Sequence, residues 1–242
     1  LIYSDVSYAQ FVARYKKRRH VVYFGGNDGM MHAVNGGFYS DVDKKFCLQE
    51  PTADGKCPVN DGTATISGVA IDTAPALGAE LWAYVPYNLQ PHLKCLAEPF
   101  YAHKYYVDLK PRVFDAQIFT PDTDHPNGWG TILVGGLRFG GTPVDVGYDD
   151  NGVTKQQPYV SSYFILDISN PEKPPVLLGE LTQEYDASSQ KRWVDLGYTT
   201  VIPTMVINKT STASEWYLVF GSGPHGSDGL KGVSDQQPRV SI

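Results

Sequence analysis

Three times in this sequence, a short apolar strand pattern ends at closely spaced glycines, and a second strand pattern follows. The glycines begin at Gly25, Gly135 and Gly221, and the strand patterns before them are residues 21–24, 131–134 and 216–220. The returning patterns begin at residues 30, 163 and 239. Sixteen tyrosines and only three methionines also favour strands over helices. The repetition predicts an all-β fold that is built from similar antiparallel hairpins.

The spacing of the glycines predicts long insertions between these hairpins. Gly25 and Gly135 are 110 residues apart, and Gly135 and Gly221 are 86 residues apart. Because propeller blades repeat every ~40–50 residues, we expect insertions at about residues 36–78 and 140–160. The sequence therefore predicts a modified β-propeller of about three to four blades, with residues 1–242 as part of one domain. A β-sandwich is the alternative, but its strands recur at regular intervals of about 8–12 residues.

The two ends of the chain suggest a piece of a longer protein. Leu1 is not preceded by Met, and residues 239–242 have the pattern of a strand that has just begun. We expect this last strand to lack a partner. Open sheet edges recruit other chains, so the isolated piece is expected to associate.

A helix is predicted at residues 5–19. Tyr8, Phe11, Val12 and Tyr15 recur at helical spacing, and Asp5 or Ser7 could cap the first turn. The basic run at residues 14–19 is interpreted as a solvated helix end rather than as a patch for anionic surfaces. A second short helix is predicted at residues 89–97.

Composition argues against two classes of partner. The net charge of −6 disfavours nucleic acid, whose binding depends on the neutralisation of phosphates. No apolar run approaches the ~18 residues that a membrane span requires.

Two of the three cysteines flank a polar loop that is rich in turn-forming residues. Cys47 and Cys57 are predicted to form a disulfide, which indicates an oxidising compartment; two unpaired loop thiols are the alternative. Cys95 lies among leucines at helical spacing and is predicted to be a buried free thiol. The sequence contains no CxxC motif or Cys/His cluster that would indicate zinc or c-type haem.

Two loops carry oxygen ligands of the kind that calcium prefers. One contains Asp145, Asp149, Asp150, Asn151 and Gly152, and the other contains Asp122, Asp124, Asn127 and Gly128. Neither has the complete set of 6–8 ligands that calcium typically takes. We interpret both first as solvated turns, in which Asp, Asn and Gly are favoured, and keep calcium as the alternative.

No residue pattern indicates catalysis. Asn27, Asp28 and Gly29 are predicted to form a tight turn, with Asp28 bonding backbone amides and Gly29 at positive φ. His32 and His103 are interpreted as hydrogen-bonded core residues rather than as general bases. No nucleophile elbow, Walker sequence or dinucleotide motif occurs, so we expect a protein that is not an enzyme.

Eight collinear segments of the chain resemble the PilC/PilY family of type IV pilus tip-associated proteins. The most characteristic are VVYFGGNDGMMHA at residues 21–33, ELWAYVP at 80–86 and WGTILVGGL at 129–137. The others are at residues 7–12, 103–108, 166–171, 221–224 and 234–236. Together they extend over essentially residues 5–242.

The resemblance implies a modified β-propeller at the C-terminus of a large secreted protein. Such proteins support pilus assembly, oppose pilus retraction and act as adhesins at the pilus tip or cell surface. The implied partners are pilin or minor pilins and a host or abiotic surface, and the implied location is extracellular. Some members bind calcium in this domain, through a loop downstream of the SDQ segment at 234–236, so the resemblance assigns no calcium ligand in this chain.

Two other functions use similar folds. A periplasmic quinoprotein-like dehydrogenase would need a complete ring with a central polar pocket. A carbohydrate-binding propeller is suggested by the four tryptophans and sixteen tyrosines, although aromatic residues at strand positions more often pack in cores.

Overall fold

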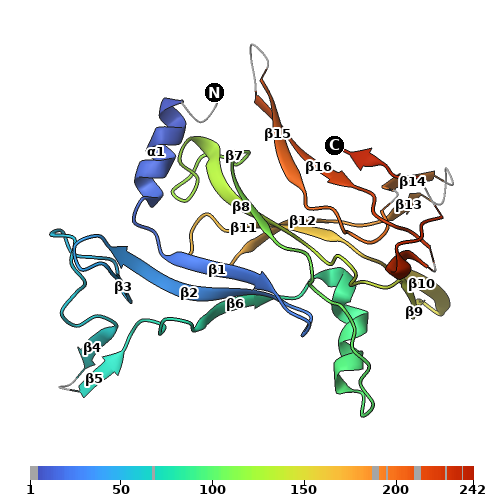
Figure 1. Ribbon diagram of the computed structural model, residues 1–242, viewed down its shortest axis with the longest axis horizontal. Coiled ribbons are helices and arrows are strands. Elements are labelled where there is room, and N and C mark those ends of the chain that lie inside the picture. Colours follow the sequence, from blue (N-terminus) through green and yellow to red (C-terminus); the bar gives the residue numbers. More distant parts are fainter. Residues whose placement is uncertain are drawn as a thin grey trace.

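The computed structural model describes residues 5–66, 69–186, 191–194, 196–209, 214–226, 228–235 and 237–242. Gln236, the last residue of the SDQ segment, lies outside this set. Most described strands belong to three antiparallel sheets that follow one another along the chain (Figure 1). The predicted all-β class is therefore confirmed. Within the described residues, no helix is long and apolar enough to cross a membrane.

The first sheet has β2 at its centre. β1 (His20–Gly25) and β6 (Glu80–Tyr84) pair with the two sides of β2 (Met31–Ser40). Alternate residues of β2 are buried from Met31 to Asn35, which is the period of two that a half-buried strand requires. This strand therefore presents one face to the protein interior.

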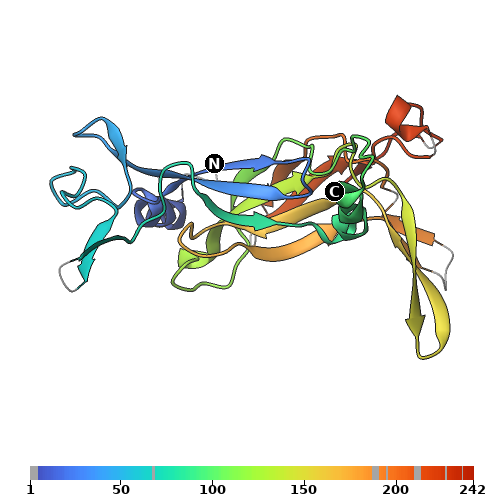
Figure 2. The same cartoon turned by 90° about the horizontal axis from the view of Figure 1, so that it is seen from below.

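The segment between β2 and β6 carries three further strands. β3 (Lys45–Cys47) pairs with the end of β2, and β4 (Thr63–Ile66) forms a hairpin with β5 (Val69–Asp72). These strands lie at one end of the molecule's long axis (Figures 1 and 2). They fall within the predicted insertion at 36–78, although β2 continues to Ser40 before the chain leaves the sheet.

The second sheet is a meander interrupted by one hairpin. Its order is β12-β11-β8-β7, with the bounds Arg112–Gln117 for β7, Trp129–Gly136 for β8, Tyr163–Asp167 for β11 and Val176–Leu181 for β12. Every residue of β8 is buried, as expected for a central strand covered on both faces. Between β8 and β11, the hairpin of β9 (Val144–Asp150) and β10 (Val153–Tyr159) projects from the opposite end of the molecule (Figure 2).

The third sheet contains the end of the chain. β15 (Thr204–Lys209), β16 (Ser214–Gly221) and β17 (Val240–Ser241) pair in that order, and the short hairpin of β13 (Glu184–Asp186) and β14 (Lys191–Val194) precedes them. β17 pairs with β16 through Phe220 and Gly221. The prediction that the last strand lacks a partner is therefore wrong, because the glycine end of β16 accepts it.

The three glycine landmarks occupy equivalent places. Each ends the first strand of an antiparallel pair: β1 with β2, β8 with β11, and β16 with β17. At Gly135, a Cβ atom would lie 2.1 Å from the Phe164 ring, and at Gly25 it would lie 2.2 Å from the Val107 carbonyl oxygen. Close packing against neighbouring segments therefore explains why the pattern needs glycine.

The modified β-propeller of about three to four blades stays a prediction. In the part of the chain that the structure describes, the three sheets do not close on themselves.

Helices are few and short. α1 (Val6–Tyr15) begins at the N-cap Asp5, whose side chain accepts a hydrogen bond from Ser7 N at 2.8 Å, and it ends four residues earlier than predicted. Its buried Phe11 packs near Trp129 of β8. The second helix, η2 (Tyr87–Ala97), is 3-10 rather than α and contains a proline. Two single turns, η3 (Pro126–Gly128) and η4 (Gly229–Lys231), complete the helices of the described residues.

The core has two parts, one at each junction between sheets. The larger joins the first and second sheets around Met31, Tyr106, Leu133 and Phe164. The smaller joins the second and third sheets around Leu109, Tyr163, Leu196 and Phe220. Each sheet is therefore held to its neighbour by buried apolar side chains.

Candidate functional site

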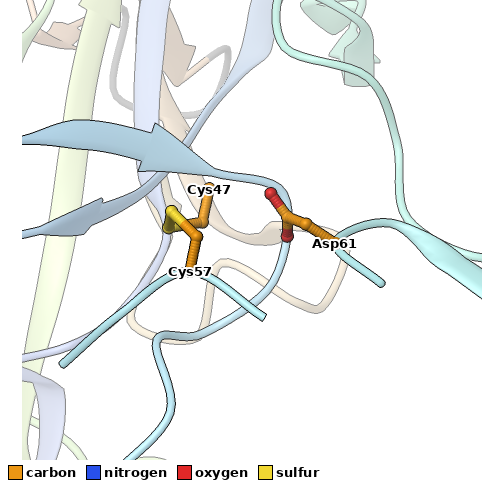
Figure 3. A group of neighbouring side chains, drawn as sticks. All are labelled: Cys47, Cys57 and Asp61. Carbon is orange, nitrogen blue, oxygen red and sulfur yellow. A yellow bond between two sulfur atoms is a disulfide. The ribbon is translucent and has the colours of Figure 1, made fainter. Parts of the chain in front are cut away.

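The loop after β2 is fastened by a disulfide. Cys47 and Cys57 are bonded, with Cα atoms 5.4 Å apart, so the predicted pairing is present (Figure 3). Two hydrogen bonds between side chains and the main chain support it: Cys57 N donates to Asp43 Oδ2 at 2.8 Å, and Ser40 Oγ donates to the Gly55 carbonyl at 2.6 Å. Cys95 is a buried free cysteine, also as predicted.

Asp61 lies beside this disulfide (Figure 3). A carboxylate oxygen and both sulfur atoms are within 4.8 Å of one another, a grouping that could hold a metal ion. A metal would require cysteine thiolates, whereas these sulfur atoms are bonded to each other. Both Asp61 oxygens also accept main-chain hydrogen bonds, from Leu48 N and Gln49 N at 2.8 Å. The group therefore acts as a structural clasp for the loop.

The turn between β1 and β2 forms as predicted. Gly29 has a φ of +95°, and Asp28 Oδ1 accepts a hydrogen bond from Met30 N at 3.2 Å. The third turn residue, Asn27, accepts a hydrogen bond from Tyr106 N through its side chain at 3.2 Å. The turn therefore also holds the irregular segment that carries Tyr106.

His32 joins this turn to the edge of the first sheet. Its Nε2 lies 2.9 Å from Asp28 Oδ2, and its Nδ1 lies 2.6 Å from Glu80 Oε2 on β6. Burial alone would lower the pKa of His32, but the hydrogen bonds with Glu80 and Asp28 outweigh it and raise the pKa above the ordinary value. His32 is thus a hydrogen-bonded structural residue. The same prediction for His103 is wrong, because that residue is exposed.

The first of the two acidic loops, for which calcium is the alternative, is the tip of the β9–β10 hairpin. Asn151 and Gly152 form its two-residue turn with φ values of 55° and 81°, and Asp149 Oδ1 accepts a hydrogen bond from Gly152 N. Asp150 pairs with Lys155. Asp145 lies four residues before Asp149 on one strand, which separates their Cα atoms by roughly 13 Å. The structure therefore does not gather Asp145, Asp149 and Asn151 around one point.

In the second acidic loop, Asp122 has partners within its own turn. Its Oδ1 accepts hydrogen bonds from Asp124 N and His125 N at 2.8 and 2.7 Å, and it lies 2.9 Å from His125 Nδ1. The hydrogen bonds from His125 lower the pKa of Asp122. The other nitrogen of His125 contacts Asp167 Oδ2 at 2.9 Å, and its ring stacks on Phe119.

The other two members of this loop point to different neighbours. Asp124 accepts a hydrogen bond from Asn170 Nδ2 at 2.9 Å and pairs with Lys173, whose contact is the main cause of a lowered Asp124 pKa. Asn127 has a φ of 56° and donates to Gln10 of α1 at 2.7 Å. The loop thus ties α1 to the second sheet. Among the described residues, neither acidic loop supplies three His, Cys, Asp or Glu ligand atoms within 4.8 Å of one another.

The basic run after α1 differs from the predicted solvated helix end, because two of its arginines form hydrogen bonds within the protein. The Arg19 side chain is 6% exposed; its Nε and Nη2 donate to the two oxygens of Glu172 at 2.7 and 2.9 Å, and its Nη1 donates to Asn35 at 2.8 Å. Arg18 donates to Thr131 Oγ1 of β8 at 2.8 Å. Because Glu172 lies 153 residues after Arg19, no local sequence signal could reveal this contact.

Comparisons with known proteins find two similar sequences. The chain is 30% identical over 154 residues, 63% of its length, to a protein named type IV pilus biogenesis factor PilY1 homolog from Xylella fastidiosa. A second protein with the same name and source is 25% identical over 219 residues, 90% of this chain. The predicted resemblance to the PilC/PilY family is confirmed.

The chain spans only 8% and 12% of the length of these two PilY1 homologs. The 219-residue match is long enough to include residues from all three sheets of this fold. No protein-family profile matches the chain, and no solved structure matches it.

Proposed function

We propose that this chain is a non-enzymatic module of a type IV pilus biogenesis factor that supports pilus assembly and surface attachment. The observation that carries the proposal is its similarity to the two PilY1 homologs over 63% and 90% of its length. The disulfide supports a place outside the cytosol, since such bonds persist in oxidising compartments. The proposed location is therefore the pilus tip or outer cell surface, reached through the periplasm.

The proposed architecture is a modified β-propeller. The second sheet is a four-stranded antiparallel meander, the pattern of a propeller blade, and the first and third sheets repeat its glycine-ended strand pair. Apolar contacts join each sheet to the next. In this proposal, further blades of the parent protein complete the ring.

The proposed contact surfaces are the two inserted segments. The disulfide-fastened loop and the β9–β10 hairpin lie at opposite ends of the long axis (Figures 1 and 2). Loops on a rigid scaffold commonly carry binding function. Their separation allows one end to contact pilin or minor pilins while the other meets a host or abiotic surface.

The location can be tested with an epitope placed in the β9–β10 turn. Asn151 and Gly152 are the connecting residues of that exposed hairpin, so an insertion there leaves the ladder intact. In cells that produce the tagged parent protein, immunogold labelling should place the epitope on pili, and cross-linking should capture pilin or minor pilins. Labelling confined to the cytoplasm would contradict the proposal, as would intact pili without label.

A further inference from the structure

A cavity of about 450 Å³ lies where η2 meets the segment after β8. Its size falls within the ~300–1,000 Å³ of small-molecule sites. Its chemically informative lining residues are His92, Lys94, His103, Lys104, Tyr105 and Phe139. The sequence assigned none of these six residues a binding role. Four further lining residues, at positions 141–144, belong to the predicted insertion at 140–160.

The charge of this cavity is positive. Lys94 and Lys104 line it, no Asp or Glu does, and neither lysine forms an ion pair among the described residues. By contrast, Lys155, Lys173 and Lys231 each pair with an aspartate. In a chain with a net charge of −6, two unpaired ammonium groups at one cavity form a local site for an anion.

One wall of the cavity is aromatic. The His103 and Tyr105 rings have centroids 5.3 Å apart, and Tyr105 and Phe139 have centroids 5.8 Å apart. Tyr105 is 45% exposed, so part of its surface is open to a ligand rather than buried in the core. This row of rings offers a ligand an apolar surface beside the two cations.

A buried polar atom lies on a residue that lines the cavity. His92 lines the cavity, and its Nε2 is inaccessible to solvent and has no hydrogen-bond partner. Buried polar atoms without partners are rare in folded proteins and call for an explanation. Burial, and then the charges of Lys104 and Lys94, lower the pKa of His92, which favours the neutral ring with one nitrogen able to accept a hydrogen bond.

We propose that this cavity binds an acidic monosaccharide unit, a hydroxylated ring that carries a carboxylate, as in a uronic acid or a sialic acid. The carboxylate pairs with Lys94 and Lys104 through charge-assisted hydrogen bonds. The sugar ring packs on Tyr105 and Phe139. A simple inorganic anion would use the lysines alone and leave the aromatic wall without a role.

The test is a two-dimensional NMR titration of the 242-residue chain with glucuronate, N-acetylneuraminate, glucose and acetate. We expect one of the two acidic sugars to bind at least tenfold more tightly than glucose and acetate, with shifts at residues 91–106 and 139–144. The better of the two identifies the class. Equal binding of acetate would reduce the cavity to a plain anion site and overturn the proposal, as would equal binding of glucose or no binding.

Variants locate the site. The double variant Lys94→Ala/Lys104→Ala should weaken binding of the acidic sugar at least tenfold. Lys17→Ala/Lys45→Ala makes the same charge change at two exposed lysines outside the cavity and should leave binding unchanged. Tyr105→Ala should weaken binding of the acidic sugar several-fold without affecting acetate. Equal loss in both lysine double variants would show a non-specific charge effect and refute the site.

Discussion

The buried contact of Arg19 gives the sharpest stability prediction. We expect Arg19→Ala to lower the free energy of unfolding by about 2–3 kcal/mol. The substitution removes a bidentate pair with Glu172, a hydrogen bond to Asn35, and the packing of the guanidinium 4.7 Å from the centre of the Phe38 ring. This contact joins the first sheet to the segment that follows β11, so its loss should loosen the junction between two sheets.

The magnitude follows from the unequal exposure of the two partners. Removing one member of a fully buried ion pair costs about 3–5 kcal/mol. The Glu172 side chain is 52% exposed and can be solvated when Arg19 is absent, which places Arg19→Ala below that range. Glu172→Gln keeps the shape but leaves the buried cation without its counterion, and we expect it to cost about 1–2 kcal/mol.

Urea denaturation followed by tryptophan fluorescence measures both variants and their double mutant. The double mutant should lose about 1 kcal/mol less than the sum of the single losses, since the two groups share one interaction. Lys17→Ala, on the exposed helix end, is the control and should change stability by less than about 0.5 kcal/mol. An Arg19→Ala variant as stable as this control would refute the reasoning.

Three further predictions concern other parts of the fold. Reducing the disulfide should raise hydrogen exchange in residues 41–61 and leave β8 protected, since the chain-entropy model assigns roughly 3 kcal/mol to a disulfide that closes a loop of this size. Unchanged exchange in the loop would show that the disulfide does not hold it in place. The pKa of His32 is raised in the folded state, so its stabilising effect should be full below about pH 6 and be lost as the pH rises through the folded pKa. The melting-temperature difference between wild type and His32→Gln should therefore be larger at pH 5.5 than at pH 8.5. A constant difference would exclude the ion pairs of His32 with Asp28 and Glu80. Gly135→Ala should destabilise by about 1–3 kcal/mol in urea, because the new methyl group overlaps Phe164; a neutral effect would mean that the glycine is not needed for packing.

The strands and their glycine ends could be predicted from sequence because they depend on local pattern. Residues 131–134 form an apolar run before Gly135, and the structure places them in β8 with that glycine against Phe164. The disulfide was predictable for the same reason, since its two cysteines flank one short loop.

Features that depend on distant contacts were not predictable. The helix stops at Tyr15 because the following arginines turn inward to Thr131 and Glu172, more than 100 residues away. The acidic loop at 122–127 has the composition of a calcium site, yet Asp124 faces Asn170 and Lys173. Composition alone cannot distinguish a cation ligand from a carboxylate that already has a protein partner.

The central claim, that this module serves pilus assembly and attachment, is tested most directly by deleting the codons for residues 5–242 in frame from the chromosomal gene of the parent protein. The measurement is the amount of surface pilin, together with twitching motility and attachment. The account predicts that surface pili and attachment fall sharply, and that pili return when the retraction motor is also removed. Wild-type levels of pili, motility and attachment in a strain that still secretes the truncated protein would contradict it.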